Sequence, residues 1–182
     1  MDEVGRLQPV LDHYMEYAMN AQSETWADKL GLGVLQESDE PLVNDLLTLL
    51  GATEVDMTIF FRLLCSITQP DVAHLSAAFY EGDEPSKTAW NAWLGRWWER
   101  VDEKPDRATM RKTNPKYVLR NWMAQLAIDS AEEHGDFSIA EELHELLKRP
   151  YDEQPEHEDK WFQKRPEWAR HRVGCSMLSC SS

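Results

Sequence analysis

The sequence predicts an all-α fold, and two observations support this. Apolar residues recur at intervals of three and four along most of the 182-residue chain, which is the spacing of one face of a helix. No segment shows sustained alternation of apolar and polar residues between hairpin turns, the pattern typical of β-strands. The composition is that of a folded protein, with 42% hydrophobic and 29% charged residues. The length suits one domain, with or without a tail.

The first helical segment is expected between residues 7 and 30, as one long helix or two. Gly31 and Gly33 predict its end. The stretch GLGVLQ that starts there resembles a dinucleotide-binding fingerprint, but Gln36 stands where the third glycine is needed and no strand precedes it, so a helix stop is the better interpretation. The apolar face of this segment consists of Leu7, Val10, Leu11, Tyr14, Met15, Tyr17, Ala18 and Ala21.

Three shorter helices and a tryptophan-rich helix are expected next. The shorter ones cover residues 42–50, the very apolar stretch MTIFFRLLCSI that Asp56 opens, and residues 72–80. The following GDEPS is expected to be a linker because of its turn-forming residues. In the tryptophan-rich helix, a row of aromatic faces could stack on sugars or bases, but core packing or an interdomain contact is the better interpretation of helical spacing. The shared face consists of Trp90, Trp93, Leu94, Trp97 and Val101.

Capping signals mark two further helices. Asn114 is expected to cap a helix whose first residue is Pro115 and which runs to about Gly135. Ser138 begins a capping-box pattern for a helix that reaches Leu147.

The character of the chain changes after this helix. Residues 1–150 are interpreted as one helical region, and residues 151–182 as an extended tail with two prolines inside its dense charge. The tail is expected to dock through Trp161 and Trp168 rather than to form a packed helix. No internal repeat is visible.

The charge and the cysteine content exclude several classes of function. A net charge of −14 repels phosphate backbones and anionic membrane surfaces, so nucleic acid and membranes are not expected as partners. No apolar run approaches the roughly 18–20 residues that a membrane span needs, and the N-terminus does not resemble a secretory signal. Three cysteines do not suit a secreted disulfide framework. A cytoplasmic location is therefore expected.

The sequence contains no complete catalytic constellation, and no catalytic, cofactor-binding or metal-binding residue is assigned. HGDFS at 134–138 is close to the metal-binding Asp-Phe-Gly of kinases, but it lies between two helices and is better interpreted as a turn and a cap. The HE pair at 144 begins a zinc-protease motif, yet Lys148 stands where the second histidine is required. Arg120 and Asn121 are expected to fix the fold rather than to contact a substrate.

The two cysteines near the C-terminus are the candidate regulatory residues. Cys175 and Cys180 lie outside any helical face, so burial as small apolar residues explains them poorly. A thiol on a mobile, exposed segment oxidises reversibly, and the basic residues just before Gly174 favour the thiolate modestly. A redox or regulatory disulfide and an incidental pair both remain open at this point.

Four stretches in order carry a resemblance to a known family. They are NPKYVLRNWMAQLAIDSAEEHGDFS, RPYDEQPE, RPEWA and the terminal SCSS, with ADKLGL and DMTIFFRLL fitting more loosely. Together they resemble the C-terminal part of the selenoprotein O family, protein adenylyltransferases on a kinase-like fold. The resemblance implies binding of ATP and Mg²⁺ by the full-length proteins and transfer of AMP to Ser, Thr or Tyr hydroxyls of protein substrates. Cys180 matches the position that holds selenocysteine in some members and resembles a redox switch in bacterial members.

The resemblance also implies what this chain lacks. The family's phosphate-gripping loop, ATP-binding lysine and metal-binding Asp and Asn precede the matched region, so the chain is expected to be a C-terminal fragment, inactive without the kinase-like lobe that would be its partner. Its own role is then structural and redox-regulatory, through Cys180 with Cys175. One alternative is a free-standing helical interaction module. A second is a small thiol oxidoreductase, although such enzymes usually place a Cys-x-x-Cys pair at a helix start.

Overall fold

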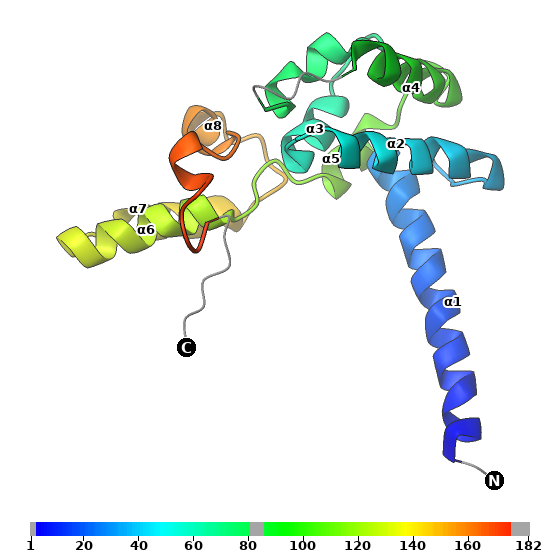
Figure 1. The fold of residues 1–182 in the computed structure, drawn as a ribbon, viewed down its shortest axis with the longest axis horizontal. Coiled ribbons are helices and arrows are strands. Elements are labelled where there is room, and N and C mark those ends of the chain that lie inside the picture. The colour runs from blue at the N-terminus through cyan, green and yellow to red at the C-terminus, as the bar shows by residue number, and fades with distance from the viewer. Residues whose placement is uncertain (1–2, 81–85, 176–182) are drawn as a thin grey trace.

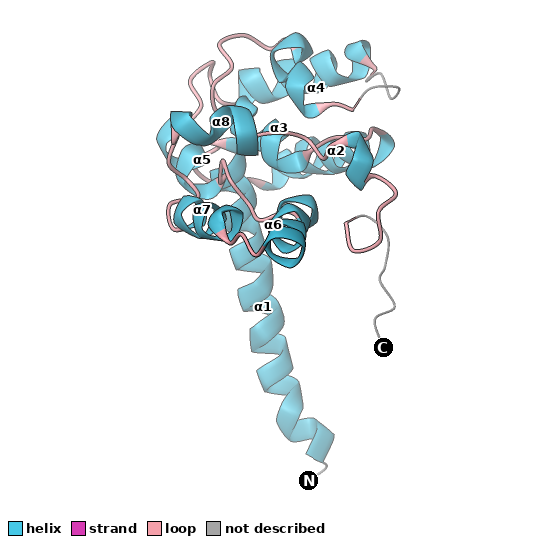
Figure 2. Ribbon diagram, turned by 90° about the vertical axis from the view of Figure 1, so that its left-hand side faces the viewer, coloured by secondary structure: helices cyan, strands magenta, loops and turns pink. Residues whose placement is uncertain are grey.

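The computed structural model describes residues 3–80 and 86–175, apart from the side chains of residues 3–8 and 12. These residues are mainly helical and contain no β-strand, so the predicted all-α class is confirmed (Figure 2). One isolated antiparallel bridge joins Val55 to Phe79. The helices, with 3₁₀ helices marked η, are α1 (Glu3–Leu30), η1 (Glu37–Asp39), α2 (Glu40–Ala52), α3 (Met57–Leu64), η2 (Val72–Ala78), α4 (Lys87–Arg100), α5 (Arg107–Thr113), α6 (Asn121–His134), α7 (Ser138–Leu147), α8 (Pro155–Trp161) and η3 (Glu167–Ala169).

Helix α1 is one continuous helix of 28 residues, and most of it projects from the body as an arm (Figure 1). It ends at Leu30, followed by Gly31 and Gly33 with positive φ, as the sequence predicted. The described side chains from Val10 to Met19 are mostly exposed, including those of the apolar face. Among its described side chains, those of Ala27 and Leu30 near its C-terminal end are buried in the body.

The first of two clusters of buried residues lies between Ala27 and Met110 and has the tryptophans of α4 at its centre. Trp93 and Trp97 stack with ring centroids 6.3 Å apart. Their indole N–H groups donate to the carbonyl oxygens of Leu42 and Leu30, each over 2.8 Å. Buried indole N–H groups usually find such an acceptor, although those of Trp90 and Trp122 find none among the described residues. Trp93 and Trp97 are therefore core residues, as their helical spacing predicted.

The second cluster forms around α6 and α7, which pack side by side (Figures 1 and 2). Trp161 of α8 closes it by stacking on Trp122 at 5.9 Å. Phe162 packs against both clusters. The buried residues of this second cluster are Tyr117, Trp122, Met123, Leu143, Leu146, Trp161, Ala169 and Cys175.

The predicted helix start at Asn114 is wrong. Asn114 instead follows α5, a helix that the sequence did not predict, and is buried there. The next residues are extended, since the amides of Lys116 and Tyr117 both donate to the carbonyl oxygen of Pro150. Tertiary hydrogen bonds thus override the local Asn-Pro capping signal, and α6 begins only at Asn121.

The prediction of a wholly extended tail is also wrong, because α8 lies within it with a proline in its first turn. Trp161 is buried as expected, whereas Trp168 is 44% exposed and does not dock. The separation of residues 1–150 from residues 151–182 stays a prediction. The boundary between the two clusters of buried residues lies at a different place in the sequence, between Met110 and Tyr117.

The turn after α1 yields a stability prediction. Gly31 and Gly33 both have positive φ, but a Cβ on Gly31 would lie 2.8 Å from Met110 Sδ, whereas one on Gly33 would meet nothing within 4 Å. We expect Gly33→Ala to cost about 1–2 kcal/mol through backbone strain alone, and Gly31→Ala about 1–3 kcal/mol more because of overpacking. A Cβ on Gly31 would also lie 3.0 Å from the backbone nitrogen of Asp106. Urea denaturation of both variants measures the difference, and equal losses of stability would contradict overpacking at Gly31.

Candidate functional site

The two clusters meet at a junction built from charged side chains. Arg120, just before α6, pairs through both terminal nitrogens with the carboxylate of Asp56, whose other role is to accept from the Ile59 amide and cap α3 at 3.0 Å. The two side chains are 15% and 5% exposed. Burial lowers the pKa of Arg120 to about 10, which leaves the guanidinium protonated at neutral pH. The pair therefore joins the clusters as a buried, bidentate ion pair.

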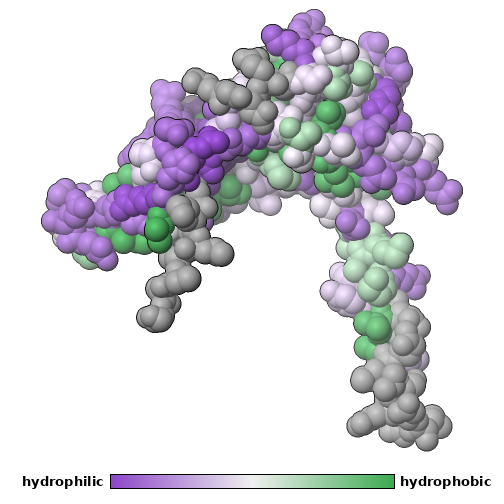
Figure 3. Space-filling model, viewed as in Figure 1, coloured by the Kyte–Doolittle hydropathy of each residue, from purple (hydrophilic) through white to green (hydrophobic). Residues whose placement is uncertain are grey.

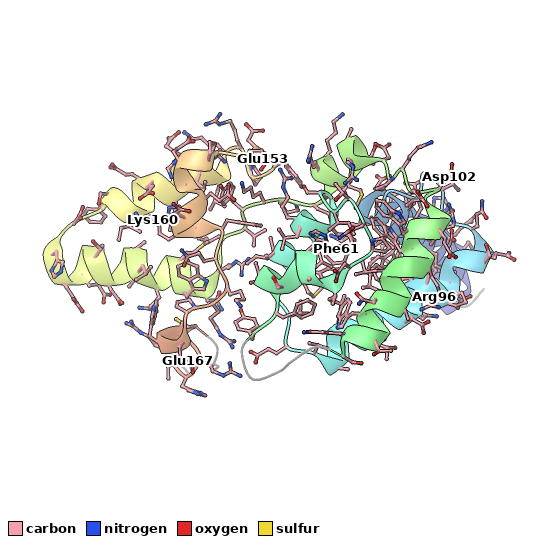
Figure 4. The ribbon with its side chains drawn as sticks, turned by 90° about the horizontal axis from the view of Figure 1, so that it is seen from above. Phe61, Arg96, Asp102, Glu153, Lys160 and Glu167 are labelled. Carbon is pink, nitrogen blue, oxygen red and sulfur yellow. The ribbon has the colours of Figure 1, made fainter. Side chains whose placement is uncertain are left out.

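Arg62 of α3 makes the second connection. Its buried guanidinium donates to the carbonyl oxygens of Arg111, Asn114 and Tyr151, each over 3.1 Å, and also binds the carboxylate of Glu153. Figure 4 shows Glu153 beside α8 and Phe61 on α3, on the two sides of this junction. The planar fork of arginine suits several acceptors at once. One side chain thus fixes two loops that lie far apart in sequence.

Lys116 occupies the same junction from the extended linker. Its buried ammonium group donates to Glu153 Oε2 at 3.0 Å and to Glu158 Oε2 at 2.7 Å. Burial on its own lowers the pKa of Lys116, but the hydrogen bonds to Glu158 and Glu153 outweigh it and the pKa lies above its usual value. Glu153 bridges the two cations, Arg62 and Lys116. Both cations are neutralised within the chain and serve the fold.

A small pocket lies next to the junction, where the end of α1 meets α3. Lys29 Nζ donates to Asn114 Oδ1 at 2.9 Å and lies 4.3 Å from the ring centroid of Phe61. Asn114 donates in turn to the Lys29 carbonyl oxygen at 3.0 Å and to Cys65 Sγ at 3.7 Å. Burial lowers the pKa of Lys29 and raises the pKa of the Cys65 thiol. Cys65 is therefore a neutral, poorly nucleophilic thiol at neutral pH.

The size of this pocket argues against a ligand site. Its volume is about 200 Å³, whereas pockets for small molecules usually measure about 300–1,000 Å³. Within the described part of the chain, no group of three or more His, Cys, Asp or Glu side chains is arranged to hold a metal ion. No helix among the same residues has both the length and the apolar character to cross a membrane. The charged side chains of the junction position loops.

Of the two cysteines predicted to be regulatory, the structure describes Cys175. Cys180 lies outside the described residues. Cys175 is 8% exposed and belongs to the second cluster, and its carbonyl oxygen accepts from Asn121 Nδ2 at 3.2 Å. The expectation of an unburied thiol is wrong for Cys175, because the turn after η3 packs against α6 and Arg172 pairs with Asp129 of that helix at 2.7 Å. Its regulatory role stays a prediction.

Sequence reasoning missed the two most connected cations of the junction. Arg62 had a usable signal, because a single charged residue within the apolar stretch MTIFFRLLCSI predicts a buried, paired side chain. Lys116 had none, since its partners lie about forty residues away in sequence. Arg120 and Asn121 were expected to fix the fold, and their contacts confirm that. HGDFS is a turn, as expected, with Asp136 accepting from the Ser138 amide at 2.9 Å.

The junction predicts an asymmetry between two ion pairs. Asp56→Asn keeps a good helix cap but leaves Arg120 as a buried charge without its counterion, so we expect a loss of about 3 kcal/mol or more. Asp45→Asn is the control, because it breaks the exposed pair with Arg96 and should cost less than about 1 kcal/mol. Urea denaturation compares the two, and a similar small loss for both would show that the Asp56 pair does not hold the clusters together.

Sequence comparison with known proteins shows the family to which this chain belongs. The model of the family described as protein adenylyltransferase SelO matches residues 2–148. The chain is 43% identical to the protein nucleotidyltransferase YdiU of Flavobacterium johnsoniae, over 100% of this chain and 37% of that protein. It is 44% identical to its counterpart from Rhodopirellula baltica, over 99% of this chain and 37% of that protein. The chain thus spans little more than a third of the length of these relatives. It belongs to the SelO family of protein adenylyltransferases.

Proposed function

We propose that this chain is the helical C-terminal region of a kinase-like protein adenylyltransferase, with a structural and redox-regulatory role. The observation that carries the proposal is the family match over residues 2–148, together with coverage of only 37% of relatives named as protein nucleotidyltransferases. On this proposal, ATP, Mg²⁺ and the protein substrate bind mainly to the kinase-like lobe that such relatives would carry outside the matched region. This chain supports that lobe and does not catalyse AMP transfer alone.

The charges of the described residues support the proposal that nucleotide binds to the other lobe rather than to this chain. An ATP site needs cations or free amides to neutralise its phosphates. Arg62, Arg120 and Lys116 are the buried or nearly buried cations of the junction, and each is already bound to a carboxylate. The net charge of −14 works against phosphate binding as well. The chain is therefore better suited to stabilising a nucleotide-binding lobe than to replacing it.

The redox part of the proposal concerns Cys180, with Cys175 as the nearest thiol in sequence. Cys175 is held in the second cluster. In the proposed step, two thiols lose two protons and two electrons to a small-molecule disulfide, which is reduced to two thiols, and one S–S bond forms in the protein. The partner of Cys180 is either Cys175 or a cysteine of the kinase-like lobe.

A free-standing helical interaction module remains the second candidate function. The exposed apolar face of α1 is the observation that favours it, because apolar surface of this kind marks interaction sites in soluble proteins. The two functions differ in the partner they require, which for the first is the remainder of a family member.

Catalysis is tested with ATP labelled at the α-phosphate, Mg²⁺ and a mixture of protein substrates. We expect no labelled protein from this chain alone and labelling by the full-length Flavobacterium johnsoniae relative, which serves as the positive control. Transfer of label by the isolated chain, retained after further purification, would contradict the proposal that the ATP site lies elsewhere.

Redox regulation is tested by treating the folded chain with oxidised glutathione and mapping its disulfides by mass spectrometry. We expect Cys180 to be oxidised first, as a mixed disulfide or paired with Cys175, and Cys65 to stay reduced because it is fully buried. Cys65 is thus the internal control. If Cys180 reacts with neither glutathione nor alkylating agents in the folded chain, the switch hypothesis fails.

A further inference from the structure

The exposed apolar side chains of α1 are a feature that the junction does not explain. The large ones are between 53% and 68% exposed, and the space-filling view shows hydrophobic residues along the arm (Figure 3). Soluble proteins rarely leave a contiguous apolar surface of this kind uncovered unless something binds there. The residues concerned are Val10, Tyr14 and Tyr17 on one side of the helix and Leu11, Met15 and Met19 on the adjoining side.

The face continues into a groove on the body. Leu11, Met15, Met19 and Trp26 are spaced by four, four and seven residues, so they form one row along α1. At the body end of this row, Met19 and Trp26 line a groove of about 500 Å³ between α1 and α2. The arm and the groove together form a mainly apolar track, with the polar Gln22 and Ser23 between Met19 and Trp26. We call it the α1 track.

The rim of the groove is acidic. Glu37 and Glu40 line it, and among the described residues neither takes part in a salt bridge. Apolar side chains also reach the groove from α2 and from the loop before it, namely Val43, Leu47 and Leu35. The chemistry of the site therefore suits an apolar segment flanked by lysine or arginine.

The length of α1 supports the presence of an occupant. A helix that makes no tertiary contacts gains little stability in water, and most helical stability in proteins comes from packing of an apolar face. The described part of the arm before Ala18 has no buried side chain. A covering partner would therefore supply the packing that this half of α1 lacks.

We propose that the α1 track is the docking surface for the remaining part of a full-length family protein, through an apolar segment flanked by basic residues. Two observations select this occupant. The family match begins at residue 2, so the arm belongs to the sequence that the family shares. The matched relatives are also far longer than this chain, which covers 37% of the first of them. The inference rests on the proposed function, because it assigns the surface through which the supporting role is exerted.

Hydrogen–deuterium exchange tests the docking directly. We compare α1 of this chain with the corresponding segment of the full-length Flavobacterium johnsoniae relative. Amides of residues 9–20 should exchange at least tenfold more slowly in the full-length protein, whereas amides of residues 27–30, which are packed in both, should differ little and serve as the internal control. Equally fast exchange of the arm segment in both proteins would overturn the proposal.

A second measurement separates docking from self-association. Sedimentation of this chain alone should show no stable dimer that depends on the track. A dimer that Met15→Glu abolishes and that Ile128→Glu, at an exposed apolar position on α6, leaves intact would assign the track to a second copy and overturn the proposal. The proposed function is tested separately, in the AMP-transfer assay. If the full-length relative proved inactive but its arm were protected from exchange, the proposed function would fail and the docking proposal would stand.

Discussion

The arrangement of the molecule depends on buried guanidinium groups at the boundary between its two hydrophobic clusters. Arg62 donates to three backbone carbonyls, one in the last turn of α5 and two on loops, and Arg120 binds the carboxylate that caps α3. Glu54 adds a third connection by pairing with Arg165 and Arg170. Hydrophobic contact alone is non-directional, whereas these donors and acceptors have fixed geometry. The relative placement of the clusters is therefore set by polar groups, with Phe162 as an apolar bridge.

In this strongly acidic chain, only a few of the described carboxylates bind the cations that connect the two clusters. Glu153 and Asp56 are neutralised by the cations they hold, so the surplus negative charge resides mostly at the surface. Such a surface keeps phosphate-rich partners away and favours partners that present apolar or basic segments. That kind of surface is compatible with the proposed role, in which the region supports another part of the protein rather than binding nucleotide.

Sequence patterns identified the helices whose boundaries depend on local signals. The Gly31 stop, the Asp56 cap and the tryptophan face of α4 all follow from the nearest residues along the chain. Prediction failed where distant contacts decide the conformation. Asn114 has a strong capping signal, yet hydrogen bonds to Lys29 keep it in a buried loop. Cys175 is surrounded by small and polar residues in sequence, and its burial depends on α6. Neither of these long-range contacts produces a pattern that can be recognised in a single sequence.

The distribution of tryptophans gives the molecule an optical property. The first cluster contains the nearly parallel pair Trp93 and Trp97, with an angle of 7° between the ring planes. The second contains Trp122 and Trp161 at 29°. Closely stacked indoles couple their electronic transitions, and near-ultraviolet circular dichroism senses that coupling only while side chains are rigidly packed. Each cluster therefore contains a stacked tryptophan pair of its own. The packing of both clusters contributes to the near-ultraviolet circular dichroism of the protein without any added label.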